Sequence, residues 1–144
     1  MTNREILRIA MEQSAVDANC RAEDFTKEEN VIVTSARNPG ARRYLELPFV
    51  CNLISYGTNV VASIDRKYEE IVQDYIGKYP AEHCFETPDL HVLNEAFLEH
   101  GMKVCFMAEY FLPDVELPRK IPCRYETRLL EQEDFKELYT KQWS

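Results

Sequence analysis

The stretch "VVASIDRKYEEIVQDYIGKYP", residues 60–80, decides the fold because it runs from a strand directly into an amphipathic helix. The apolar residues of its second half recur at intervals of three and four, which is the period of one helix face. Asp65 is placed to cap this helix, and Gly77 and Pro80 are expected to end it. The junction, residues 64–70, contains no glycine, although many α/β proteins bind phosphate through a glycine-rich loop at this position.

Further elements are predicted on both sides of this stretch from capping residues, apolar period and β-branched runs. The sequence predicts helices over about 3–18 and 87–100, strands at 30–35, 47–55, 59–64 and 103–112, and a short strand at 82–86. The strands at 47–55 and 59–64 form a predicted hairpin, and their nearly continuous apolar composition predicts burial on both faces. The expected fold class is therefore α/β (α+β), with a mixed, mostly antiparallel sheet flanked by helices.

Composition restricts the classes of function. The chain has 17 basic and 25 acidic residues and a net charge of -8, so its surface should repel nucleic acid and anionic membranes. Its five cysteines include no CxxC pair, which favours reduced thiols and no metal site. No apolar run approaches the roughly 20 residues that span a bilayer, and the charged N-terminus does not resemble a secretory signal. We expect a cytoplasmic protein.

A domain boundary is predicted at residues 113–122, where three of the seven prolines fall within ten residues. Residues 1–112 would form one domain. Residues 123–144 read as the first strand and helix of a following domain, and the apolar stripe of this helix has nothing after it to cover it. An uncovered stripe is typical of a partner surface, for a homodimer or for a missing C-terminal domain. Its members are Phe135, Leu138, Tyr139 and Trp143.

The order of elements in residues 1–112 resembles the fold of the GNAT-type N-acetyltransferases. The segment "NEAFLEHGMKV", residues 94–104, is similar to the helix near the end of that fold. The tail "YETRLLEQEDFKELYTKQWS", residues 125–144, resembles the opening strand and first helix of a complete GNAT domain. The resemblance implies that the chain is the N-terminal part of a bacterial protein that transfers an acetyl group from acetyl-CoA to an amine. It also implies that residues 1–112 are themselves a degenerate GNAT-like repeat.

The same resemblance nominates a cofactor site at the junction. The family pattern there is Arg or Gln, two residues, Gly, one residue, then Gly or Ala. Arg66 matches the first position and Lys67 follows it, whereas Glu69 and Ile71 replace the glycine and the small residue. Acidic residues already satisfy the N-terminus of this helix, so the junction should need no phosphate. The 144 residues alone should therefore have little or no acetyltransferase activity.

Four chemically active residues lie within nine positions: His83, Cys84, Glu86 and His91. A cysteine with a histidine can form a nucleophile pair, and two histidines with a glutamate can bind a metal. Neighbours on a strand point to opposite faces, however, so Cys84 is expected to be a packed thiol and His83 an ordinary surface residue. Glu86 and His91 lie near a helix start and are candidate catalytic residues.

Three further groups have both a functional and a structural interpretation. Glu109 lies in the predicted strand 103–112, on a face open to solvent or to a catalytic cleft. The loop "ARNPGARR", residues 36–43, either binds an anion through Arg37, Arg42 and Arg43 or is simply solvated. The stripe Tyr68, Tyr75 and Tyr79 either supplies an acid or packs in the core.

Three functions remain open from the sequence. The first is a GNAT-related acetyltransferase domain that uses acetyl-CoA. The alternative is a non-catalytic GNAT-like binding or dimerisation module, supported by the missing glycines. A hydrolase dependent on Cys84 is the third, and it would require a thiol of low pKa.

Overall fold

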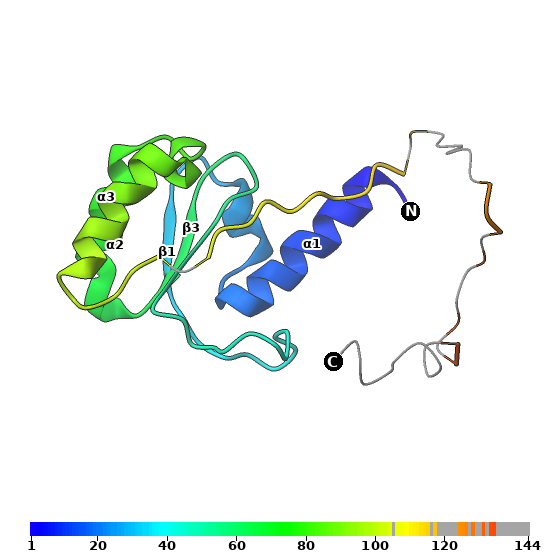
Figure 1. Cartoon of the computed structure of the whole chain (residues 1–144), viewed down its shortest axis with the longest axis horizontal. Helices are drawn as coiled ribbons and strands as arrows, with labels where there is room; N and C mark the ends of the chain where they lie inside the picture. Colours follow the sequence, from blue (N-terminus) through cyan, green and yellow to red (C-terminus); the bar gives the residue numbers. More distant parts are fainter. Residues whose placement is uncertain are drawn as a thin grey trace.

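The computed structural model describes residues 1–104, 106–115, 117, 124–126, 128, 131 and 133–134. Figure 1 shows the arrangement of the elements. In chain order these are α1 (Asn3–Ala18), η1 (Ala22–Thr26), β1 (Val31–Thr34), β2 (Cys51–Ile54), β3 (Val61–Ile64), η2 (Arg66–Tyr68), α2 (Glu69–Lys78), η3 (His83–Phe85) and α3 (Thr87–Leu98). The three η elements are short 3-10 helices.

The sheet has the strand order β1-β3-β2. β1 pairs with β3 in parallel, and β2 pairs with β3 antiparallel. A mixed sheet is therefore confirmed, but it is not mostly antiparallel, because it has one pair of each kind. The central position of β3 also explains its burial. All four residues of β3 are buried, whereas those of the edge strand β2 are only partly buried, so burial on both faces was correct for β3 and wrong for β2.

Helices cover both faces of the sheet, with α2 and α3 on one side and α1 on the other (Figure 1). On the first side, Ala62 and Ile64 join the core formed by α2 and α3. On the second side, Val61 packs with Ala15 of α1 and Phe25 of η1. Successive residues of a strand point to opposite faces, and this alternation divides the apolar residues of β3 between the two cores.

Local sequence signals explain most helix boundaries. The Thr2 hydroxyl accepts a hydrogen bond from Glu5 N, and the Glu5 carboxylate accepts one from Thr2 N, which confirms the predicted capping box. Asp65 caps the 3-10 helix η2, which leads into α2, whereas the N-cap of α2 itself is Tyr68 and has no side-chain cap. Gly77, however, lies inside α2, which ends one residue later. The packing of neighbouring buried Ile76 outweighs the weak helix propensity of glycine.

Two predicted strands are wrong. Residues 82–86 contain the 3-10 helix η3, because Cys84 N donates to Pro80 O and turns the chain immediately before α3. The described residues of 103–112 form no strand, and most of them are exposed. A strand requires a neighbouring strand to accept its hydrogen bonds, and apolar β-rich composition cannot supply one.

The segment after α3 runs to the N-terminal end of α1 (Figure 1). There Asn3 Nδ2 donates to Asp114 Oδ1 at 2.7 Å, and Val115 N donates to Asn3 Oδ1 at 2.9 Å. The predicted stripe Phe135, Leu138, Tyr139 and Trp143 lies outside the described residues. Most of the predicted linker, and of the second domain at 123–144, also lies outside them. Within the described part of the chain, no helix is long and apolar enough to cross a membrane.

Candidate functional site

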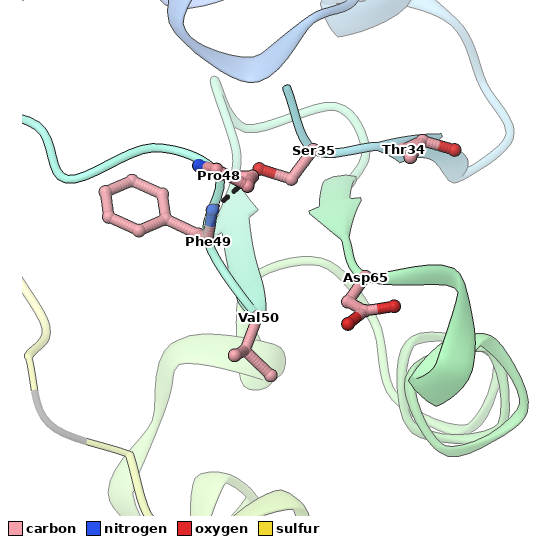
Figure 2. Close-up of a pocket in the computed structure, with 6 residues that line it drawn as sticks. All are labelled: Thr34, Ser35, Pro48, Phe49, Val50 and Asp65. Carbon is pink, nitrogen blue, oxygen red and sulfur yellow. Dashed lines mark hydrogen bonds between the residues drawn. The ribbon is translucent and has the colours of Figure 1, made fainter. Parts of the chain in front are cut away.

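A pocket of about 170 Å³ lies where β1 and β3 end and the junction to α2 begins. Figure 2 shows its six lining residues: Thr34, Ser35, Pro48, Phe49, Val50 and Asp65. Because β1 and β3 are parallel, their carboxyl ends meet at one edge of the sheet. Open α/β sheets commonly bind ligands at this edge. Arg66 and Lys67, which the family resemblance nominated, follow the lining residue Asp65 but do not line the pocket themselves.

The chemistry of this pocket does not suit a nucleotide cofactor. Its volume is below the roughly 300 Å³ of the smallest common ligand pockets. Ser35 Oγ already accepts a hydrogen bond from Phe49 N at 2.8 Å (Figure 2). Asp65 is exposed and is the charged member of the lining, and its carboxylate would repel a phosphate.

The backbone of the junction is satisfied from within. Asp65 Oδ1 accepts from Lys67 N at 3.0 Å, and Asp65 O accepts from Tyr68 N at 2.9 Å. Glu69 N donates to the Arg66 carbonyl. These are the N–H groups that a phosphate at the helix N-terminus would need. The prediction that the glycine-free junction satisfies itself is confirmed.

The two cofactor candidates are also engaged by the protein. Arg66 Nε donates to Thr34 Oγ1 at 2.7 Å, and its Nη1 pairs with Glu69 Oε2 at 2.7 Å. Lys67 Nζ lies 5.1 Å from the centroid of the Tyr68 ring. An anion would have to compete with Glu69 for the Arg66 guanidinium, at a site that is open to water.

The structure brings together only part of the His83, Cys84, Glu86 and His91 group. His83 Nδ1 lies 2.6 Å from Glu86 Oε2. His91 lies apart from this pair and contacts Glu95, with 3.7 Å between Nε2 and Oε1. The residue that joins His83 and Glu86 is Asp89, and the three ligand atoms lie within 4.8 Å of one another. Asp89 was not among the residues that the sequence singled out, although the spacing 83, 86, 89 places these residues on one side of a helical turn.

Cys84 is a core thiol. It is fully buried, its Sγ lies 3.6 Å from Tyr79 O, and its carbonyl accepts a hydrogen bond from the buried Tyr75 hydroxyl at 2.9 Å. Burial raises the thiol pKa, with smaller contributions from Asp89 and Glu82. The expectation that Cys84 is a packed thiol is confirmed. A nucleophilic cysteine needs a lowered pKa, so Cys84 does not suit the hydrolase interpretation.

The tyrosine stripe and Glu109 have structural rather than catalytic surroundings. Tyr68 and Tyr75 are buried in the core of α2 and α3, and Tyr79 packs against it. Glu109 lies exposed in an irregular segment beside Tyr110, which is 78% exposed. The strand face that would have given Glu109 its orientation is therefore absent from the described residues.

The arginine-rich loop is fastened to α1. Arg42 N donates to Asp17 Oδ1 at 2.9 Å, and Arg42 Nε lies 3.3 Å from Asp17 Oδ2. Arg37 donates to the Leu45 carbonyl, and Arg43 is exposed. The anion-binding hypothesis thus loses Arg42, since a buried carboxylate already engages it.

The chain matches no known family model, and comparisons with curated proteins and with solved structures find no similar protein. The GNAT resemblance therefore stays a prediction, and the function must be argued from the residues themselves.

Proposed function

We propose that this chain is a non-catalytic interaction module that binds a second copy of itself through residues 106–112, here called the aromatic segment. The observation that carries the proposal is the exposure of its large side chains. Phe106 is 74% exposed, Met107 52%, Tyr110 78% and Phe111 88%. Four exposed large apolar side chains thus lie within six residues, and such clustering is typical of a surface that binds proteins.

The exposure contrasts with the packing of the rest of the chain. Tyr68 and Phe97 are at most 8% exposed and face each other, with ring centroids 5.5 Å apart. Burying one large apolar side chain contributes about 1.5–3 kcal/mol. The exposed side chains of the aromatic segment do not contribute this burial energy in the single chain. Contact with a partner would bury them and stabilise the complex.

Strand addition is the binding mode that suits this segment. Its residues form no regular structure in the single chain. Their β-rich composition favours an extended conformation that pairs with a strand of a partner. The sheet offers two edges, because β1 and β2 each pair only with β3 among the described strands. Each copy carries an edge strand with half-buried apolar residues such as Leu53, so the aromatic segment of one copy can pair with an edge of the other.

The candidate cofactor site supports a non-catalytic role. The N–H groups of Lys67, Tyr68 and Glu69 are engaged, the pocket beside Asp65 is small, and burial raises the pKa of the Cys84 thiol. Acetyl transfer, which the GNAT resemblance implies for a parent protein, requires backbone donors free to hold the cofactor. We propose that this domain serves assembly rather than acetyl-CoA binding.

The assembly test is sedimentation equilibrium of the full chain over a range of concentrations. We expect a reversible dimer, and we expect the double variant Phe106→Asp, Phe111→Asp to be monomeric with an unchanged far-UV circular dichroism spectrum. Tyr44→Asp is the matched control, because Tyr44 is also 74% exposed but lies outside the aromatic segment. A monomeric wild-type protein, or a double variant that still dimerises, would contradict the proposal.

Acetyl-CoA binding is tested separately by isothermal titration, with free CoA as the comparison. We expect no saturable heat and no thermal stabilisation at millimolar ligand. Saturable binding near micromolar, lost in Arg66→Ala, would restore the acetyltransferase interpretation.

A further inference from the structure

We propose that His83, Glu86 and Asp89 form an open site for a divalent transition-metal ion of the Zn²⁺ type. This site is independent of the proposed self-association. The three side chains each offer one ligand atom, and these atoms lie within 4.8 Å of one another. His83 lies in η3, Glu86 lies between η3 and α3, and Asp89 lies in the first turn of α3, so all three come from seven consecutive residues.

The separations suit a metal after a small adjustment. Zinc binds histidine nitrogen and carboxylate oxygen at about 2.0–2.2 Å, which places neighbouring ligand atoms roughly 3–4 Å apart. His83 Nδ1 and Glu86 Oε2 are closer than this, at 2.6 Å, because they share a hydrogen bond. A metal ion would take the place of the shared proton, which would pass to solvent, and the three ligand atoms would adjust to these separations.

His83 distinguishes this three-residue group from the neighbouring carboxylates that are common on acidic protein surfaces. Carboxylates alone suit Ca²⁺ and Mg²⁺, whereas imidazole favours Zn²⁺, Co²⁺ and Ni²⁺. One nitrogen and two oxygens leave at least one coordination position for water, as in open zinc sites. The His91–Glu95 pair on the same helix has only two such groups, so it provides an internal comparison.

The backbone that carries the three ligands is anchored on both sides. Cys84 follows His83 directly, is fully buried, and donates its N–H to Pro80 O. Leu93, one turn beyond Asp89, is buried in the core of α2 and α3. The ligands therefore stand on a fixed turn and lose little backbone freedom when an ion binds.

The local charge attracts a cation. Glu86 and Asp89 bring two carboxylates to His83, and Glu82 precedes His83 in the chain. Their negative charge favours a divalent ion at this position. The positive N-terminal end of α3 opposes a cation, whereas the carboxylates of Glu86 and Asp89 attract one.

The experiment is titration of the full chain with Zn²⁺ alone, by calorimetry in a buffer that does not bind metal. We expect one ion per chain, with the dissociation constant raised about tenfold or more in His83→Ala and in Asp89→Asn. His91→Ala is the control and should bind as the wild type does. Equal affinity of the wild type and His83→Ala would overturn the proposal, as would the absence of saturable binding.

A second measurement separates this site from binding at cysteine thiols. Co²⁺ alone, added to the full chain, should broaden the ring resonances of His83 more strongly than those of His91. It should also give only weak visible absorption, because the ligands are nitrogen and oxygen. Intense near-ultraviolet absorption from thiolate ligation, with His83 resonances unchanged, would place the metal elsewhere and refute the assignment.

Discussion

Replacement of Asp17 by alanine tests how the arginine-rich loop is held against α1. The Asp17 side chain is 6% exposed. Its Oδ1 accepts hydrogen bonds from Arg42 N at 2.9 Å and from Gln13 Nε2 at 3.1 Å. Its Oδ2 lies 3.3 Å from Arg42 Nε, as an ion pair without a hydrogen bond. Alanine removes all three interactions and leaves the donors facing a gap.

The expected loss follows from these contacts. A hydrogen bond to a charged acceptor contributes about 1.5–3 kcal/mol, and breaking a fully buried ion pair costs about 3–5 kcal/mol. The Arg42 side chain is 36% exposed, so its guanidinium can reach water and the cost falls toward the lower values. We expect Asp17→Ala to lower the free energy of unfolding by about 3 kcal/mol. Asp17→Asn keeps the Oδ1 acceptor and should lose about 1 kcal/mol.

Urea denaturation followed by circular dichroism measures this loss. With an m value of about 2 kcal/mol/M, the midpoint should fall by about 1.5 M in Asp17→Ala. The control is Arg43→Ala, an exposed neighbour in the same loop, which should change stability by less than about 0.5 kcal/mol. A loss below about 1 kcal/mol in Asp17→Ala, or an equal loss in Arg43→Ala, would refute the argument that the buried carboxylate fastens the loop.

Three further predictions concern Tyr75 and Cys51. Tyr75→Phe removes the 2.9 Å hydrogen bond to the Cys84 carbonyl and should cost about 1–1.5 kcal/mol in urea denaturation, and an unchanged stability would mean that water replaces the hydroxyl. Burial raises the pKa of Cys51 from 9.0 to about 12, so the native thiol should react with iodoacetamide at pH 8 far more slowly than the urea-unfolded one, as peptide mass spectrometry would show. As the pH rises, the unfolded chain loses the Cys51 proton before the folded chain does. The contribution of Cys51 to stability is therefore complete below about pH 9 and is lost between pH 9 and 12. Urea denaturation of Cys51→Ala should accordingly show a smaller loss of stability above pH 9 than the wild type shows.

The sequence alone determined the elements whose causes are local. The capping box at Thr2 and Glu5 begins α1, and the helical period after Asp65 specifies α2. The absence of glycine after Ile64 also determined that the junction would satisfy itself, since capping carboxylates act within one turn. These features depend on residues at most a few positions apart.

Only the tertiary structure decided the features that depend on distant partners. Strand order brought β1 beside β3 and left β2 at an edge, which no local period specifies. Among the described residues, the expected strand at 103–112 finds no neighbouring strand, and its aromatic residues are exposed, because backbone hydrogen bonds of a strand require a second chain segment. Asp89 joined His83 and Glu86 only because η3 replaced the expected strand at 82–86. A strand would have pointed alternate side chains to opposite faces, whereas a helical turn gathers residues three apart on one side.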